Sequence, residues 1–208
     1  MHTRREGIKG IEPVDFRYAR ELGYAIKLVA HTQRHRGRIE ARVHPALVPL
    51  DHPLAQVEGA DNAVFVEGDL VGRVLLKGQG AGGRPTASAV VGDLIDLGRS
   101  ITRGVQNRPS FTFDDRVGVI PMGEVVTRAY YRIRAEDRPG VLAAVGQIFA
   151  EEGVSISSFI QKDAWVEEKT AELVITTHPT EETRLQKARE RIAGLQPVRA
   201  VSSFLRVF

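Results

Sequence analysis

A glycine cluster, Gly78-Gln79-Gly80-Ala81-Gly82-Gly83, is the segment with the clearest chemical potential, because it stands between a predicted strand and a predicted helix. It satisfies the G-x-G-x-x-G pattern of dinucleotide-binding turns. That unit also needs a second parallel strand that ends near an acidic residue, roughly 20 positions on. Asp93 and Asp96 instead fall inside the predicted helix. We therefore do not interpret the cluster as this fingerprint.

The residues after the cluster favour a different chemistry. The run Arg84-Pro85-Thr86-Ala87-Ser88-Ala89 predicts a helix with proline near its start. A loop without bulky side chains that leads into free helical N–H groups can hold an anion or a polar ring closely. The alternative is a flexible strand-to-helix turn without a ligand.

Two further turns could hold a small polar molecule. Asp137-Arg138-Pro139-Gly140-Val141-Leu142 opens a second predicted helix, and Gly153-Val154-Ser155-Ile156 begins the next predicted strand. We expect both turns at the same end of one sheet, where free backbone amides suit the carboxylate and amine of an amino acid. In the alternative interpretation Asp137 only caps the helix and Gly140 only gives packing clearance.

Other reactive side chains form no recognisable site. His31, His35, His44 and His52 lack the i, i+4 spacing of a zinc-binding helix. We therefore predict no metal site and interpret them as surface or turn residues. Ser88 lacks a G-x-S-x-G elbow, which argues against a hydrolase. We identify no catalytic residue.

The composition limits the class of protein. The chain has 208 residues, 42% apolar and 26% charged, which suits one large domain or two small ones. The absence of cysteine excludes a disulfide framework and thiolate-bound metals, and it favours a reducing compartment. No stretch approaches the roughly 18 apolar residues of a membrane span. A net charge of +3 gives no argument for nucleic acid. We expect a cytoplasmic protein that binds neither membrane nor nucleic acid.

The elements around the glycine cluster form the first predicted domain. We expect an amphipathic helix, four strands with hairpin spacing in an antiparallel sheet, and a long helix that lies on this sheet. The proline-bearing segment 47–54 should be irregular or edge structure. Since one helix covers only one face, the other face predicts a homodimer or a higher homo-oligomer. The helices are predicted at 12–23 and 86–103 and the strands at 24–32, 38–43, 62–67 and 73–77.

The second predicted domain begins near Arg128, after a proline-bearing linker at 104–127. Its elements follow the β-α-β-β-α-β order of ferredoxin-like folds. The fold class is therefore α+β, an antiparallel or mixed sheet with covering helices followed by a ferredoxin-like domain, with domains at 1–127 and 128–208. The strands are predicted at 129–135, 154–162, 169–177 and 198–206 and the helices at 139–152 and 181–195.

Ordered blocks over about a hundred residues resemble the middle of homoserine dehydrogenase. They are EGI (6–8), YARELGYAIKL (18–28), RVHPALVP (42–49), DHPLA (51–55), NAVFVEGD (62–69) and GAGGRPTASAVV (80–91). The C-terminal segment is similar to an ACT domain at 137–142 and 153–158, as in the longer bacterial homoserine dehydrogenases.

The resemblance implies an activity and a regulator. The family reduces aspartate semialdehyde to homoserine with NADPH or NADH, in the route to threonine, methionine and isoleucine. By this resemblance Gly80, Ala81, Gly82 and Thr86 would contact the cofactor near its nicotinamide, and the ACT domain would sense an amino acid, with threonine as the expected feedback inhibitor. The residues expected at the effector are Asp137, Gly140, Val141, Leu142, Val154 and Ser155.

The resemblance starts after the family's N-terminal dinucleotide-binding domain and after the motif that supplies its catalytic lysine and substrate-binding carboxylates. Lys27 lies in a predicted strand outside that motif, so we interpret it as structural. We expect the isolated chain to be inactive, as a truncated or split gene product or an expressed fragment whose other half comes from a separate N-terminal chain. The alternative function is a stand-alone amino-acid-binding regulatory protein without catalysis.

Overall fold

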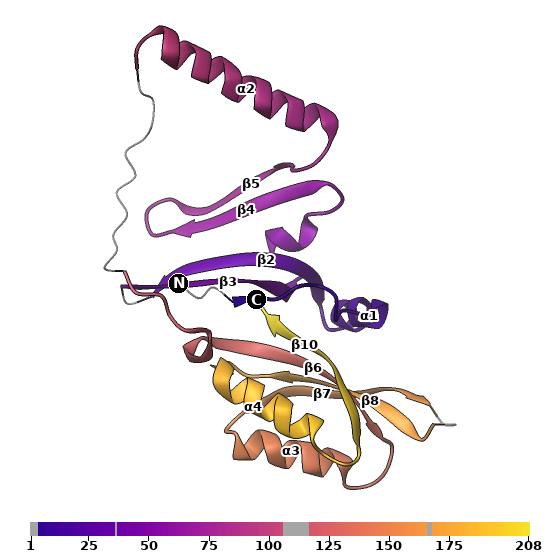
Figure 1. The fold of residues 1–208 in the computed structure, drawn as a ribbon. Helices are drawn as coiled ribbons and strands as arrows, with labels where there is room; N and C mark the ends of the chain where they lie inside the picture. The colour runs from indigo at the N-terminus through magenta and orange to yellow at the C-terminus, as the bar shows by residue number, and fades with distance from the viewer. Residues whose placement is uncertain (1–3, 36, 106–116, 166–167) are drawn as a thin grey trace. The chain divides into compact units, whose positions relative to one another are not determined.

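The computed structural model describes residues 4–35, 37–105, 117–165 and 168–208 (Figure 1). The chain divides into two compact units. The first unit comprises Met1–Leu50 and Arg116–Phe208, and the second unit comprises Asp51–Asp115.

The first unit is built on an eight-stranded mixed sheet with the order β1-β3-β10-β6-β8-β7, in which β2 pairs with β3 and β9 with β6. β3 pairs antiparallel with β2 but parallel with β10, so the sheet is mixed. The strands are β1 (Arg4–Arg5), β2 (Tyr24–His35), β3 (Arg38–Pro49), β6 (Val126–Glu136), β7 (Ile156–Trp165), β8 (Thr170–Thr177), β9 (Thr180–Glu181) and β10 (Val198–Val207).

Helices α3 (Val141–Glu151) and α4 (Glu182–Ala193) lie together on one face of this sheet (Figure 1). Their apolar residues pack against alternate residues of β6, because successive side chains of a strand point to opposite faces. The order β6-α3-β7-β8-α4-β10 confirms the predicted ferredoxin-like domain and the α+β class. The centre of this core contains Tyr131, Ile133, Val145, Phe149, Leu185 and Ile192.

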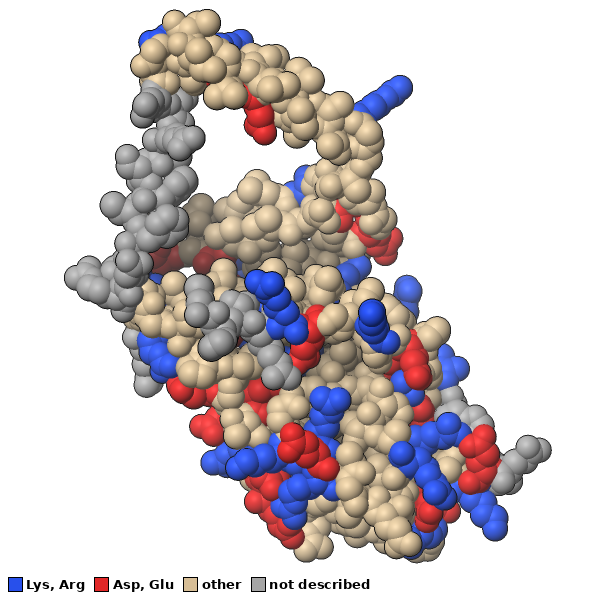
Figure 2. All heavy atoms as spheres, in the orientation of Figure 1, with Lys and Arg blue, Asp and Glu red and all other residues tan. Residues whose placement is uncertain are grey.

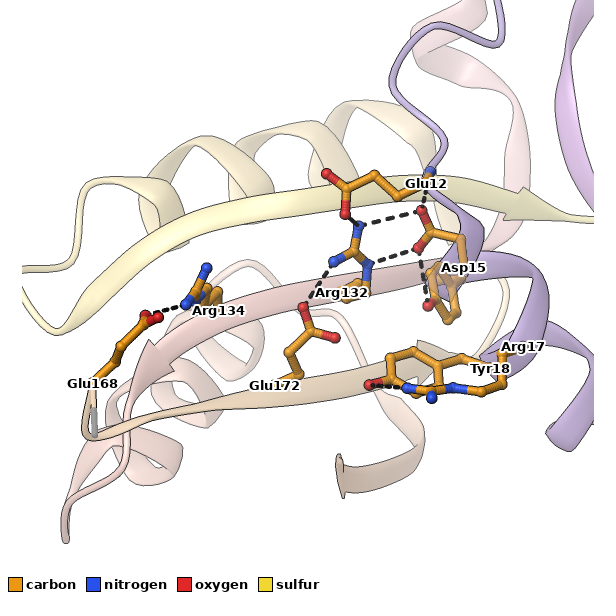
Figure 3. Close-up of polar contacts among 9 residues, drawn as sticks. Glu12, Asp15, Arg17, Tyr18, Arg132, Arg134, Glu168 and Glu172 are labelled. Carbon is orange, nitrogen blue, oxygen red and sulfur yellow. Dashed lines mark hydrogen bonds and ion pairs between the residues drawn. The ribbon is translucent and has the colours of Figure 1, made fainter. Parts of the chain in front are cut away.

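Helix α1 (Pro13–Glu21) packs on the opposite face of the same sheet. Its buried Tyr18 lies in a cluster with Tyr130 of β6 and Val174 of β8. Beside this cluster Arg132, 3% exposed, contacts Asp15 and Glu12 at the start of α1 and Glu172 of β8 (Figure 3). The N-terminal segment and the ferredoxin-like domain therefore form one compact unit.

The segment 47–54 differs from its prediction only in its first part, because β3 continues past Pro45 to Pro49. On the side of β3 away from β2, Pro45 lies in a gap between two partner strands. β1 pairs with Arg42 and Val43, and β10 pairs with Ala46 and Leu47. Pro45 is therefore tolerated. A proline lacks the N–H group that a continuous ladder would need there. Irregular structure begins after Pro49, with a turn at 50–52 that is followed by the short helix η1 (Pro53–Gln56).

The second unit contains a two-stranded hairpin, β4 (Asp61–Gly68) and β5 (Gly72–Gln79), and the long helix α2 (Gly83–Thr102). The predicted strands do form, but the expected four-stranded sheet is wrong, since β2 and β3 belong to the sheet of the first unit. The expectation that the long helix covers a sheet is also wrong, because no residue of α2 is buried. Hairpin spacing predicts that neighbouring strands pair, but it does not predict which hairpins belong to the same sheet.

The surface of α2 is largely uncharged in Figure 2, where most of its visible atoms belong to residues other than Lys, Arg, Asp and Glu. Its exposed apolar residues are Val90, Val91, Leu94, Ile95, Leu97 and Ile101. No helix among the described residues is both long and apolar enough to span a membrane.

The predicted boundary between 127 and 128 falls inside β6, within the first unit. Residues 106–116 of the predicted linker lie outside the described residues. Beyond them Val119 makes a parallel bridge with Ile39, and a short helix, η2 (Met122–Glu124), precedes β6. The boundary at 127 is therefore a prediction about function and not a division between compact units.

Candidate cofactor loop and effector turns

The glycine cluster connects β5 to α2 in the second unit. The N–H of Gly80 donates to the carbonyl of Ala60 at 3.0 Å. A Cβ atom at position 80 would lie 1.6 Å from Nδ2 of Asn62, so any side chain there would displace the Asn62 amide. Gly82 has a φ of +124°, which glycine adopts without steric cost. The two glycines therefore let the backbone pass close to Asn62 and turn sharply into α2.

The start of α2 is exposed and electropositive. Gly82 is the N-cap residue, and the N–H of Thr86 donates to its carbonyl at 3.1 Å. The first turn contains no acidic residue and includes Arg84. Free N–H groups at a helix start carry a partial positive charge. The four predicted cofactor residues, Gly80, Ala81, Gly82 and Thr86, lie together here, and all are exposed.

The turn between β6 and α3 begins the second candidate site. Gly140 has a φ of +90° and is the N-cap of α3. Asp137 therefore does not cap the helix, contrary to the purely structural alternative. Its N–H donates to the carbonyl of Lys169 at 2.8 Å, and its carboxylate accepts a hydrogen bond of 3.2 Å from the Gln161 amide. Val141 is buried and Leu142 is exposed.

The other predicted effector turn lies at the opposite end of the sheet. Both β6 and β7 run antiparallel to β8, with Glu136 opposite Thr170 and Ile156 opposite Thr177. The α3 helix of 11 residues therefore separates the two turns by roughly 16 Å. The expectation that both turns share one end is wrong, because a strand-helix-strand crossover returns the chain to the starting end. Val154 and Ser155 do not meet Asp137 and Gly140 within one chain.

Gln161 is a residue that the sequence analysis missed. It lies opposite Leu173 on β7, on the face of the sheet that carries the α3 and α4 core, and it contacts Asp137. Gln161 is exposed, and a glutamine at an exposed strand position is ordinary. The sequence around it therefore carries no signal for this contact.

The histidines have separate structural roles. Nδ1 of His31 lies 3.2 Å from Oε1 of Glu40, and Nδ1 of His52 accepts the N–H of Leu54 at 3.2 Å. His44 is 2% exposed and lies inside β3, so its interpretation as a surface or turn residue is wrong. Its Nδ1 pairs with the carbonyl of Pro45 at 2.9 Å. Burial, together with nearby arginines, lowers the pKa of His44 to about 4. Among the described residues, no group of three or more His, Asp or Glu could hold a metal ion.

Two family profiles match the chain on either side of the predicted boundary. Residues 1–95 match the homoserine dehydrogenase family, and residues 132–196 match the ACT domain. Homoserine dehydrogenase of Neisseria gonorrhoeae is 41% identical over 207 residues, which cover 97% of this chain and 47% of that protein. The enzyme of Mycobacterium tuberculosis strain H37Rv is 42% identical over 223 residues, which cover 100% of this chain and 50% of that protein.

A solved structure shows similarity to the same family. The crystal structure of a homoserine dehydrogenase from Thiobacillus denitrificans aligns with a TM-score of 0.84 at 40% identity, over 98% of this chain and 47% of that one. The chain thus spans about half the length of the relatives it matches.

Proposed function

This chain is homologous to the C-terminal region of homoserine dehydrogenases and carries an ACT domain, and from that premise we propose that it supplies one wall of a redox site and the sensor that regulates it. The reaction would be the interconversion of aspartate semialdehyde and homoserine. The observation that carries this proposal is the similarity to the Thiobacillus denitrificans structure along nearly the whole chain.

The glycine loop is the proposed contact with the cofactor. The family is NAD(P)-dependent, and the nicotinamide supplies or accepts the hydride. Gly80, Ala81 and Gly82 would let the cofactor approach the backbone, since no side chain larger than a methyl group projects from them. Thr86 would offer its hydroxyl from the first turn of α2. The lack of an acidic residue in that turn supports the binding of an anionic or hydrogen-bond-accepting group of the cofactor.

We propose that the proton donor and the nucleotide-binding domain belong to the other half of the enzyme, in the same or a separate polypeptide. The length of the relatives, about twice that of the aligned region, supports this proposal. The choice between NADP and NAD would be made in that half. We propose that the reaction takes place in the cytoplasm, because a chain without cysteine suits a reducing compartment.

The ACT domain is the proposed amino-acid sensor, with threonine as its effector. Asp137, Gly140, Val141 and Leu142 would receive the amino acid at the start of α3, where N–H groups face an exposed turn and Gln161 orients the Asp137 carboxylate. Val154 and Ser155 would reach the same effector only from a second copy of the chain, because they lie at the other end of α3. This favours a homodimer or a higher homo-oligomer. Functionally, we retain the division into a catalytic part at 1–127 and a regulatory part at 128–208.

A chimaera tests the catalytic proposal. The C-terminal half of the Thiobacillus denitrificans enzyme is replaced by this chain, and the oxidation of NADPH by aspartate semialdehyde is followed through the loss of NADPH absorbance. We expect turnover by the chimaera and none by the isolated chain. Turnover by the isolated chain, or an inactive but folded chimaera, would contradict the proposal. If the chain binds threonine while the chimaera binds no cofactor, the alternative of a stand-alone regulatory protein is preferred.

A further inference from the structure

Strand β10 carries two irregularities on the ferredoxin-like sheet. Its register against β6 shifts between Val198 and Ala200 and again between Val201 and Ser203. The residues that face the helical core are consequently Val198, Val201 and Phe204, spaced by three instead of two. Each bulge therefore adds a residue to the opposite face, so that Arg199 and Ser202 join the side chains there. Bulges commonly re-aim side chains next to functional sites.

These added residues border a pocket on the sheet face opposite α3 and α4. Its volume is about 510 Å³, within the range of small-ligand sites. It spans three adjacent strands, β10, β6 and β8, beyond the part of this face that α1 covers. The pocket is lined by Arg134, Glu168, Thr170, Arg199, Ala200 and Ser202.

The charges around the pocket are of both signs. Arg134 forms an ion pair with Glu168, and the two side chains point toward one another in Figure 3. Arg199 pairs with Glu136 at 3.0 Å. Both pairs are partly exposed, so a ligand can compete for them at low cost. The neighbouring Arg132 is fully engaged with Asp15, Glu12 and Glu172 and does not serve the pocket.

Unpaired buried polar atoms gather on the same face. The hydroxyl of Thr170, a residue only 4% exposed, has no hydrogen-bond partner among the described residues. The same holds for Oε2 of Glu172, two positions along β8, and for the hydroxyl of Ser203 on β10. A buried polar atom without a partner costs free energy, so such atoms indicate a missing ligand or ordered water.

We propose that this pocket binds a free amino acid, at a site separate from the turn at the start of α3. The ligand's carboxylate would pair with Arg134 and Arg199, and its ammonium group would pair with Glu168 and the Thr170 hydroxyl. A zwitterion matches a lining with both signs of charge, whereas a polyanion would meet Glu168 and Glu136. The amino-acid class rests on the proposed sensing function of the ACT domain.

The experiment is a titration of the full ¹⁵N-labelled chain with the standard L-amino acids, one at a time, followed by backbone amide shifts. At least one amino acid should shift the amides of 168–170 and 199–202 saturably. Its amide and its N-acetyl derivative, which each lack one charge, should bind at least tenfold more weakly. Inorganic phosphate that shifts these amides with equal affinity would overturn the proposal, because the site would then recognise an anion alone.

Two variants and a matched control complete the design. Arg199→Ser removes a carboxylate partner, and Ala200→Leu fills the pocket at an exposed position, so both should weaken binding at least tenfold without unfolding the chain. Arg184→Ser, at another exposed arginine with an ion pair, should change nothing. Amide shifts confined to 137–142 would overturn this site and keep the effector proposal. Amide shifts confined to 168–170 and 199–202 would support this pocket and overturn the effector proposal. If no amide shifts in either region, both proposals are overturned.

Discussion

Arg132 of β6 holds Asp15 of α1 through two hydrogen bonds, Nε to Oδ1 at 2.7 Å and Nη2 to Oδ2 at 3.3 Å, across 117 residues of sequence (Figure 3). Asp15 is completely buried, and its carboxylate also accepts the N–H of Glu12 in the capping box of α1. Burial lowers the pKa of Arg132, but the hydrogen bonds to Asp15 and Glu172 outweigh it and raise the pKa above its ordinary value. The contact ties the start of α1 to the ferredoxin-like sheet.

Asp15→Asn should therefore destabilise the chain strongly. The amide keeps the shape of the carboxylate but removes its charge, which leaves part of the buried guanidinium charge uncompensated. Removing one partner of a buried ion pair typically costs about 3–5 kcal/mol. We expect a loss of this order in the free energy of unfolding, measured by urea denaturation and circular dichroism.

The matched control for Asp15→Asn is Glu124→Gln. Glu124 pairs with Arg38 at 3.0 Å, but these side chains are 56% and 44% exposed. Exposed pairs contribute roughly 0–1 kcal/mol. If the two variants lose the same stability, the Arg132 contact does not hold the two segments together.

The pH dependence of stability should carry a contribution from His44. Its pKa is about 4 in the folded chain, against the ordinary histidine value of 6.5 expected once the chain unfolds, chiefly because burial disfavours the charged imidazole. Between these values the unfolded chain binds a proton that the folded chain does not. The free energy of unfolding therefore falls as the pH is lowered from 6.5 to 4, by up to about 1.4 kcal/mol per pH unit.

A His44→Asn variant isolates this contribution. The difference in unfolding free energy between pH 7 and pH 5 should be smaller in the variant, since asparagine does not titrate. Glu40 does not obscure the result. Its pKa is lowered by contact with His31 and Arg42, against the opposing effect of burial, so its contribution is lost only at lower pH. An unchanged pH difference would show that His44 binds its proton as readily in the folded chain as in the unfolded chain.

Local patterns predict the individual elements because their signals lie within one segment. The helices and strands of the ferredoxin-like domain lie within a few residues of their predicted positions. The glycine cluster also connects a strand to a helix, as predicted. The partners of the first two hairpin strands are not predictable in this way. Their assignment to the larger sheet depends on β3 meeting β10, a contact between Leu47 and Val207 that no local pattern encodes.

The candidate sites show the same limit. The glycine loop is one continuous segment, so the family resemblance could assign its four residues together. The effector turns are two segments, and their separation is fixed by the direction of β7 relative to β8. Gln161 was missed because its contact with Asp137 joins residues 24 positions apart.

Gly80→Ala tests the proposed cofactor loop in the chimaera. A methyl group at 80 would overlap the Asn62 amide and displace the loop, so we expect kcat/KM for NADPH to fall roughly tenfold, equivalent to about 1.4 kcal/mol. Gly78→Ala is the matched control, because a Cβ atom at 78 meets nothing within 4 Å. Adding Asn62→Ala to Gly80→Ala should restore much of the loss. Equal effects at 78 and 80 would contradict this account.

Gln161→Leu tests the effector turn. Gln161 is exposed, so its replacement should leave the fold intact while the hydrogen bond to Asp137 is lost. Loss of one such bond is worth about 1 kcal/mol, so the Kd for threonine should rise roughly fivefold in calorimetry. Gln147→Leu is the control, since Gln147 lies exposed on α3 and its amide donates to Glu151 of the same helix, away from Asp137. Gln147→Leu could instead weaken threonine binding as much as Gln161→Leu does. Effector binding would then not depend on the contact between Gln161 and Asp137, and the proposal that the turn at the start of α3 is the sensor would be wrong.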